Sequence, residues 1–314
     1  MIDQNNNYTI DKAKAYEHQQ AARNLFKKNK ILEGIEELKK AIRYDPVCPN
    51  HFCNIGYYYM EINQGKEAVI YARRCYELID EAIKATGLQD KTQRQIKDFS
   101  NMLATAGSIM EYYGDPNARK CLETAVRLNP KNWGARYNLG LYYLKNDLTE
   151  YAIREFEAAY KFNKHYPDLI TELAYSYNHV GMIEESISVI DAYKQGHPLT
   201  EEMLYILADN YYGLGRDSEV MSILKEVIEK NPNSAFAHAA LGEVYAHAGW
   251  EKEAYDEIMI AKSLNKIEKD QDAENIIKKV LNWLDDPDDD NNTMLPVFLL
   301  LLLKKKMLEK RYSR

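Results

Sequence analysis

Residues 139–156 read LGLYYLKNDLTEYAIREF, and residues 173–190, 207–224 and 241–258 repeat the same pattern at steps of 34 residues. A leucine opens each stretch, a small residue follows it, and a tyrosine stands three positions further on. These columns are Leu139, Leu173, Leu207 and Leu241; Gly140, Ala174, Ala208 and Gly242; and Tyr143, Tyr177, Tyr211 and Tyr245. Several copies in strict register indicate an internal repeat, and this repeat decides the fold.

Each repeat is expected to form two helices joined by a turn. Spacings of three and four residues place the leucine, the small residue and the tyrosine on one side of a first helix. Gly181, Gly215 and Gly249 mark the turn, because glycine adopts a left-handed backbone easily. Pro198 and Pro232 end two of the second helices. The second helix carries a small or β-branched column (Ala152, Ser186, Val220, Ala254) and a bulky column (Phe156, Ile190, Leu224, Ile258).

This pattern resembles the tetratricopeptide repeat family, whose unit is a helix-turn-helix of 34 residues. The resemblance implies an all-α fold, a right-handed superhelical α-solenoid of about seven repeats with a C-terminal capping helix. It also implies that the protein binds a partner segment and is not an enzyme. Self-similarity of this kind makes one elongated array more probable than two separate cores.

The expected organisation follows from extending the repeat in both directions. A polar segment covers 1–14, two repeats cover 15–82, an insertion covers 83–98, five repeats cover 99–268, a capping helix covers 269–284, an acidic linker covers 285–292, and an apolar, basic tail covers 293–314. The insertion is interpreted as longer helices in the second and third repeats around a protruding loop, in which Asp90 could cap the following helix. The third repeat has a weak signal, with Thr105 where leucine is expected.

In this family the ligand usually lies in a concave groove lined by the first helices. Carrying the groove positions over residue by residue gives two sets of candidate partner-binding residues: Asn50, Asn54, Tyr57, Tyr137, Asn138 and Leu141; then Asp168, Glu172, Tyr175, Glu202, Tyr205, Asp209 and Glu243. Asparagine can hydrogen-bond a peptide backbone, and tyrosine offers a large contact area. The second set is largely acidic, which favours a basic or amphipathic ligand, although acids of this kind also form ordinary solvated faces.

One subfamily binds the C-terminal carboxylate of a chaperone tail with a Lys-Asn-Asn-Lys-Arg set. Asn54 and Asn138 resemble its two asparagines, but Cys53 and Gly134 stand where cations would be needed. That carboxylate clamp is therefore not predicted.

Composition excludes other classes of function. The formal net charge of −7 argues against nucleic acid as a partner. The sequence contains no Gly-rich phosphate loop, HExxH or GxSxG motif, so neither a catalytic residue nor a cofactor is expected. The first residues lack the basic and apolar stretches of a secretory signal, which predicts a cytoplasmic protein.

The cysteines are expected to be reduced thiols. A metal site built from Cys48, His51 and Cys53 and closed by Cys75 is the alternative. It is not predicted, because this spacing matches no known zinc pattern.

The tail leaves several interpretations open. Residues 294–303 are uninterrupted apolar sequence, and residues 304–314 hold six basic residues against one acid, which leaves −12 for residues 1–303. A membrane-spanning helix needs about 20 apolar residues, twice this length. The tail could instead lie on a membrane surface, and the protein would then be a peripheral, membrane-docked adaptor. It could also pack on the repeats of its own or a second chain, where its charge complements the acidic set.

Overall fold

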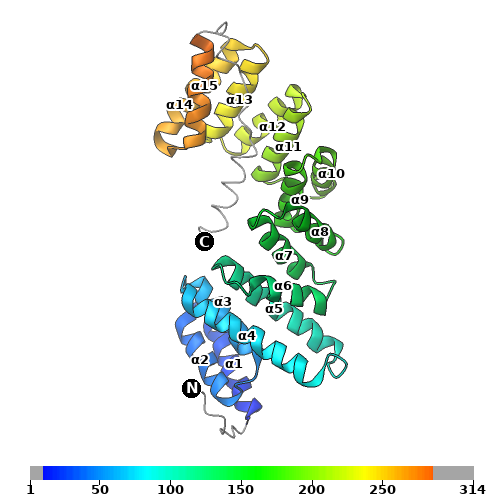
Figure 1. Ribbon diagram of the computed structural model, residues 1–314. Helices are drawn as coiled ribbons and strands as arrows, with labels where there is room; N and C mark the ends of the chain where they lie inside the picture. Colours follow the sequence, from blue (N-terminus) through cyan, green and yellow to red (C-terminus); the bar gives the residue numbers. More distant parts are fainter. Residues whose placement is uncertain (1–9, 286–314) are drawn as a thin grey trace. The chain divides into compact units, whose positions relative to one another are not determined.

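The computed structural model describes residues 10–285, and the polar segment before residue 10, most of the linker and the tail at 293–314 lie outside them. The described residues form fifteen helices (Figure 1). They are α1 Lys12–Lys27, α2 Ile31–Tyr44, α3 Pro49–Glu61, α4 Gly65–Thr86, α5 Gln93–Tyr112, α6 Ala118–Leu128, α7 Trp133–Lys145, α8 Thr149–Tyr160, α9 Pro167–His179, α10 Ile183–Lys194, α11 Glu201–Gly213, α12 Asp217–Lys230, α13 Ala235–His247, α14 Glu251–Glu268 and α15 Gln271–Asp285. The predicted all-α fold is confirmed.

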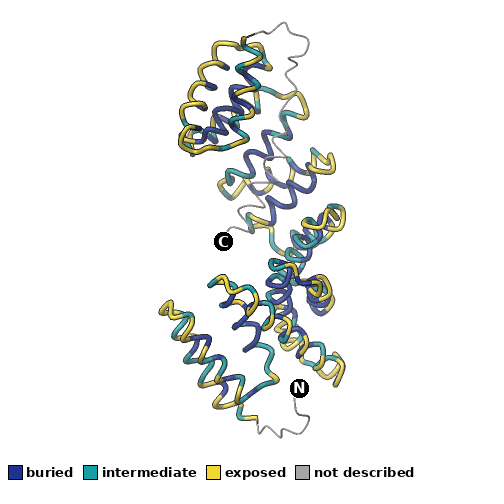
Figure 2. The backbone as a smooth tube through the Cα atoms, turned by 60° about the vertical axis from the view of Figure 1, so that its left-hand side comes forward, coloured by how far each residue is buried: buried dark blue, intermediate teal, exposed yellow. Residues whose placement is uncertain are grey.

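The helices pair into hairpins, α1 with α2 through α13 with α14, and α15 follows as a cap. The chain divides into two compact units, residues 1–163 (unit 1) and 164–314 (unit 2). In both units, buried residues line the facing sides of the helices and exposed residues gather at the turns (Figure 2). The insertion at 83–98 lies inside unit 1, away from this division.

A single backbone motif closes the turn inside every hairpin. The residue after the left-handed position donates its N–H to the carbonyl of the tyrosine column, as Met182 does to Tyr177 at 2.9 Å and Trp250 to Tyr245 at 2.8 Å. This is the bond of a Schellman cap. The left-handed position, with φ between 57° and 80°, is held by Asn29, Asn63, Gly114, Asp147, Gly181, Gly215 and Gly249. Asparagine and aspartate replace glycine there because they tolerate this conformation better than other residues.

The small residues of the first helices, the column that contains Gly140 and Gly242, let the two helices of a hairpin approach closely. A Cβ added to Gly140 would stand 2.4 Å from Cε1 of Phe156, and one added to Gly242 would stand 2.8 Å from Cγ1 of Ile258. Phe156 and Ile258 are fully buried. The small and bulky columns of the sequence are therefore the two halves of one packing contact.

The third repeat differs from its neighbours in register. A Cβ on Gly107, rather than on Ala106, would meet Leu122 at 2.6 Å, and Asp115 N–H closes the turn onto Met110 at 2.7 Å. The pattern here is Ala-Gly-x-x-Met from residue 106, one position later than the 34-residue step predicts. The repeat position assigned to Thr105 was wrong by one residue, because the small residue and its bulky partner are 15 positions apart here (Gly107 and Leu122) and 16 positions apart in the fourth repeat (Gly140 and Phe156).

The long hairpin α4–α5 occupies the inserted region. Residues 87–92 connect the two helices, and Thr92, not Asp90, caps α5. The Thr92 hydroxyl accepts from Gln95 N–H at 3.2 Å, while the Gln95 side chain accepts from Thr92 N–H at 2.9 Å. This reciprocal capping box satisfies two N–H groups at the start of the helix, whereas a single aspartate satisfies one.

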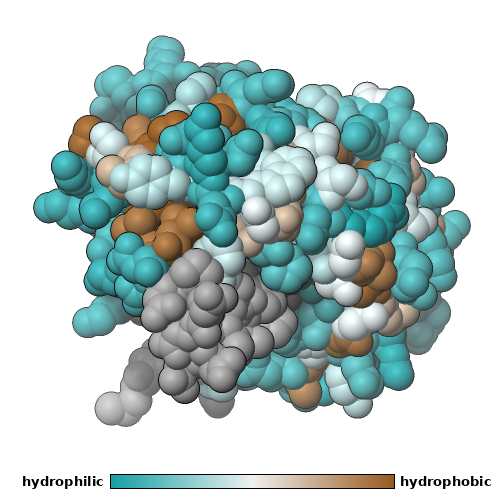
Figure 3. Space-filling view, turned by 90° about the horizontal axis from the view of Figure 1, so that it is seen from above, coloured by the Kyte–Doolittle hydropathy of each residue, from teal (hydrophilic) through white to brown (hydrophobic). Residues whose placement is uncertain are grey.

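The capping helix α15 packs on α13 and α14 with Ala273, Ile276, Ile277 and Val280, which confirms the predicted cap. Asn265 directs the chain into it, because its Oδ1 accepts from Asp270 N–H at 2.7 Å. The face seen in Figure 3 is mostly hydrophilic, with hydrophobic residues in small separate patches. A polar outer surface is what an array of repeats needs at its end.

Candidate functional site

The first helices of unit 1 carry the asparagine candidates. Asn50 Oδ1 accepts hydrogen bonds from Gln19 Nε2 at 2.8 Å and from Asn54 Nδ2 at 2.9 Å. Asn138 Nδ2 donates to the backbone carbonyl of Ala104 at 3.1 Å. These amides join neighbouring repeats, and the contacts use only part of the hydrogen-bonding capacity of each amide.

The aromatic and aliphatic candidates of unit 1 are more accessible. Tyr57 is 39% exposed and lies edge-on to Tyr58, with ring centroids 5.3 Å apart. Tyr137 is half-buried, 6.0 Å from the ring of Phe156. Leu141, at the repeat position equivalent to Tyr57, is half-buried. This face of α3 and α7 therefore offers large side chains beside amide groups.

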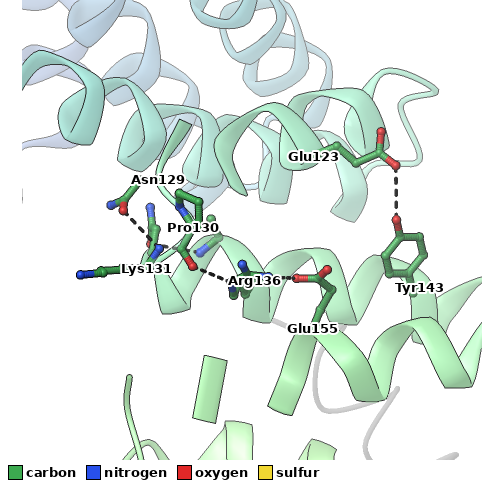
Figure 4. A network of polar contacts seen from close by, with 9 residues as sticks. Glu123, Asn129, Pro130, Lys131, Arg136, Tyr143 and Glu155 are labelled. Atoms are coloured by element: carbon green, nitrogen blue, oxygen red, sulfur yellow. Dashed lines mark hydrogen bonds and ion pairs between the residues drawn. The ribbon is translucent and has the colours of Figure 1, made fainter. Parts of the chain in front are cut away.

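A polar network fixes α7 against the preceding repeat (Figure 4). Arg136 donates to the carbonyl of Pro130 through Nε and to Glu155 through Nη1, both at 2.7 Å. The Tyr143 hydroxyl lies 3.3 Å from Glu123. Tyr137 and Asn138 follow Arg136 directly on α7, the helix that these contacts link to its neighbours.

The first helices of unit 2 carry the acidic candidates at recurring repeat positions. Asp168 of α9 and Glu202 of α11 are equivalent, and so are Asp209 of α11 and Glu243 of α13. Asp168 is exposed, Glu202 and Asp209 are half-buried, and Glu243 is buried. Glu172 of α9 is also buried. Carboxylates thus follow one another along successive first helices of this unit.

Contacts with neighbouring side chains orient these acids. The Tyr166 hydroxyl donates to Asp168 at 3.0 Å. Lys279 of α15 forms an ion pair with Glu243 at 2.7 Å. Burial, followed by the charge of Glu243, raises the pKa of Tyr212 to about 12. Lys279 was not among the predicted site residues, since only the docking of α15 brings it to Glu243.

Two tyrosine candidates of unit 2 lie in the packing between helices. Tyr205 is 3% exposed, its ring lies edge-on to Phe236 of α13 at 5.3 Å, and burial raises the pKa of its phenol. Tyr175 is equally buried and stacks on His179 at 6.0 Å. The Tyr205 side chain thus connects α11 with α13, whereas the ring contact of Tyr175 with His179 lies within α9.

A buried hydrogen-bond chain ties α9, α10 and α11 together. Asn178 Nδ2 donates to Asn210 Oδ1 at 2.7 Å, Asn210 Nδ2 donates to Ser186 Oγ at 2.8 Å, and Ser186 donates to the Ala174 carbonyl at 2.8 Å. Asn178 also donates to Asp209 at 2.9 Å. The chain places Asp209 next to the core of unit 2, so its orientation depends on buried groups.

The alternative metal site considered from the sequence (Cys48, His51, Cys53 and Cys75) is not brought together in the described residues. The Cys53 thiol donates to the Met102 carbonyl at 3.6 Å, and contact with Cys53 together with burial raises the pKa of Cys75. Cys53 and Cys75 therefore belong to the core of unit 1, whereas Cys48 and His51 lie together at the start of α3. In the part of the chain that the structure describes, no helix has the length and apolarity needed to cross a membrane.

Comparisons with known proteins identify the repeat. Residues 116–167 match the family model of the tetratricopeptide repeat. PilF of Pseudomonas aeruginosa has a similar structure (TM-score 0.55, 15% identity, covering 70% of this chain and 93% of that one). So do a tetratricopeptide repeat protein from Parabacteroides merdae (TM-score 0.54, 17%, covering 87% and 100%) and PilW, a type IV pilus biogenesis factor (TM-score 0.55, 13%, covering 69% and 94%).

A search of the curated proteins found no match. The matched model covers the α6–α7–α8 region only. The same turn closure recurs in every hairpin from α1 to α14, and the contact of a small residue with a bulky one recurs in the third, fourth and seventh repeats. Residues 116–167 therefore carry a tetratricopeptide repeat, and the described part of the chain has the fold of tetratricopeptide repeat proteins.

Proposed function

We propose that this protein is a non-catalytic interaction scaffold that binds a basic or amphipathic segment of a partner protein along the first helices of unit 2. The recurrence of carboxylates at equivalent positions carries this proposal, in one pair on α9 and α11 (Asp168 and Glu202) and in a second pair on α11 and α13 (Asp209 and Glu243). Acids that repeat with the unit form a row instead of a random scatter, and a row of this kind matches a segment with regularly spaced cations.

The partly exposed acids contribute most to recognition of such a segment. Asp168 and Glu202 are accessible enough to meet lysine or arginine, at about 0.5–1 kcal/mol for each exposed pair. Glu243 already forms an ion pair with Lys279. It therefore contributes mainly to the electrostatic potential of the surface and not through a direct contact with the ligand. Affinity should therefore depend on ionic strength, because exposed charges are screened within about 10 Å at 0.1 M salt.

Unit 1 supports a second contact of different chemistry. Its face combines Tyr57 and Leu141 with the amides of Asn54 and Asn138, which suits the backbone and apolar side chains of a peptide. Tyrosine loses little conformational entropy when it is buried in an interface. This face would add affinity with little dependence on salt.

The tail at residues 293–314 is the natural probe for the acidic row, because its basic, leucine-rich sequence has the required character. A labelled peptide of this sequence would be titrated with a chain truncated after Asp285, and fluorescence anisotropy would be measured. Saturable binding that weakens with salt is expected. The double variant Asp168→Asn, Glu202→Gln should bind about 5- to 30-fold more weakly.

The matched control is Glu184→Gln, Glu185→Gln, which removes the same charge from exposed positions of the second helix α10. Equal weakening by both double variants would show that only net charge matters, and the site would then not be on the first helices. If the peptide does not bind but the full-length chain sediments with anionic vesicles, the tail would instead serve a membrane-docked adaptor.

A further inference from the structure

The connection between α2 and α3 holds a group of metal-ligating side chains. Asp45 follows the last residue of α2, Cys48 is the N-cap of α3, and His51 lies in the first turn of α3. One ligand atom from each lies within 4.8 Å of the other two. The segment is short and rigid, because Pro46 and Pro49 restrict its backbone.

Successive backbone contacts produce this convergence. Cys48 N–H lies 3.5 Å from the Asp45 carbonyl, and His51 N–H donates to the Cys48 carbonyl at 3.3 Å. These two contacts turn the chain back every three residues, so the side chains of Asp45, Cys48 and His51 converge. The spacing Asp-x-x-Cys-x-x-His is set by the join between the first and second repeats.

Two atoms of the group are buried without a hydrogen-bond partner among the described residues, Asp45 Oδ1 and His51 Nδ1. Asp45 is 8% exposed and His51 3%. A buried polar group without a partner costs about 1–3 kcal/mol, and more when it is charged. Native proteins seldom leave such atoms unsatisfied, and a bound ion is one of the few explanations.

We propose that Asp45, Cys48 and His51 bind a zinc-type divalent transition metal, with a solvent molecule as the fourth ligand. A carboxylate, a thiolate and a neutral imidazole carry two negative charges, which balance a dication and make its burial acceptable. The mixture of oxygen, sulfur and nitrogen suits Zn²⁺ and disfavours Ca²⁺ and Mg²⁺, which take oxygen ligands.

The geometry requires only a small adjustment. Zinc bonds of about 2.0–2.3 Å place tetrahedral ligands roughly 3.3–3.8 Å apart, so ligand atoms up to 4.8 Å apart would approach by about 1 Å. Cys48 is half-buried, while Asp45 and His51 are buried. The Cys48 side therefore gives the ion its route from solvent and the position for the solvent ligand.

Metal binding here would clamp the end of α2 to the start of α3. The competing explanation is a direct Asp45–His51 hydrogen bond after a small rotation, which would satisfy both buried atoms without an ion. The two explanations differ in the part they give to Cys48: a metal site needs its thiolate, and the hydrogen bond does not.

The test uses the full-length chain without an affinity tag. Zn²⁺ affinity would be measured by competition with a chromophoric chelator, and the Co²⁺-loaded chain would be examined for a thiolate-to-metal charge-transfer band. One Zn²⁺ per chain and a clear band are expected. Cys48→Ser and Asp45→Asn should each weaken binding by at least about 100-fold, more than the loss of an outer-shell group.

His165→Ala is the matched control, because it removes an imidazole outside the proposed site, one that lies beside the ring of His197 at a centroid distance of 5.0 Å. This variant should leave Zn²⁺ affinity unchanged, and far-ultraviolet circular dichroism would check that every variant folds. Absence of stoichiometric Zn²⁺ binding by the wild-type chain would overturn the proposal. Equal affinity in the folded Cys48→Ser variant, or a Co²⁺ complex without the charge-transfer band, would also overturn it.

Discussion

Replacing Gly140 by alanine should test whether the small column exists to admit a bulky partner. The added Cβ would stand 2.4 Å from Cε1, 2.6 Å from Cδ1 and 3.0 Å from Cζ of Phe156. Carbon atoms normally approach no closer than about 3.5 Å, so the overlap is about 1 Å. Phe156 is fully buried and its ring cannot move into solvent.

The expected free-energy change follows from two opposing effects. Overpacking a core costs about 1–3 kcal/mol, and a rigid, enclosed ring places this site in the upper part of that range. Alanine in place of glycine within a helix returns about 1 kcal/mol. Gly140→Ala should therefore lower the free energy of unfolding by about 1–2 kcal/mol. In Gly134→Ala, in the same helix, the added Cβ would meet only Asn132 Oδ1 at 3.6 Å. This substitution should not destabilise the protein.

A second substitution, Phe156→Leu, tests whether Phe156 is the residue that the added Cβ crowds. In the sixth repeat the equivalent positions hold Ala208 and Leu224, both fully buried, so alanine is compatible with leucine. Phe156→Leu alone should cost about 1–2 kcal/mol through lost packing. Combined with Gly140→Ala, it should cost at least about 1 kcal/mol less than the sum of the single changes.

Urea unfolding monitored by tryptophan fluorescence measures the free energy of unfolding of each variant. Trp133 opens α7, and in a Trp250→Phe, Trp283→Phe background it reports on unit 1 even if unit 2 unfolds at another urea concentration. A Gly140→Ala protein as stable as Gly134→Ala would refute the crowding argument. Additive costs in the double variant would refute the pairing of the two columns.

Other substitutions test the turns, the buried polar chain and a titrating pair. Gly215→Ala should destabilise by about 1 kcal/mol in urea unfolding although its Cβ meets no atom within 4 Å, because φ there is 68°; Gly213→Ala, in open space at the end of α11, should not. Asn210→Ala should lower the free energy of unfolding by about 2–4 kcal/mol, since Asn178 and Ser186 each lose one buried hydrogen bond. The hydrogen bond with Glu257 raises the pKa of His238 above 6.5, so the pair stabilises the fold below about pH 6.5 and loses this effect as pH rises through the folded-state pKa. His238→Gln should therefore be more destabilising at about pH 5.5 than at about pH 8, and a loss that is equal at both would contradict the titration.

Repetition is what made the fold predictable. Columns such as Gly140 with Phe156 are visible in sequence because they encode the same contact several times. The third repeat was misread by one residue, because fixed 34-residue steps cannot detect a one-residue change in the spacing between the small residue and its bulky partner; the pair Gly107 and Leu122 could have revealed it. Asp90 was named as a possible cap from its residue type alone, whereas Thr92 caps α5 together with Gln95 three residues later.

The candidate site was less predictable, since it depends on which positions remain accessible. Sequence periodicity placed Tyr57 and Tyr205 in the same class, but Tyr57 is 39% exposed and Tyr205 3%. Packing against Phe236 decides that difference, and it is a contact between repeats. Asp45 was missed for a similar reason: it belongs to the end of one repeat, whereas Cys48 and His51 belong to the next.

The closure of every turn by a backbone carbonyl has a consequence for how such a protein evolves. Because the bond is made by the main chain of the tyrosine column, the side chain there can change, as it has at Met110. The only strict demand is one residue that accepts a left-handed backbone, which glycine, asparagine and aspartate all meet. A duplicated unit can therefore drift far in sequence, acquiring a new surface, before it loses the ability to form its hairpin.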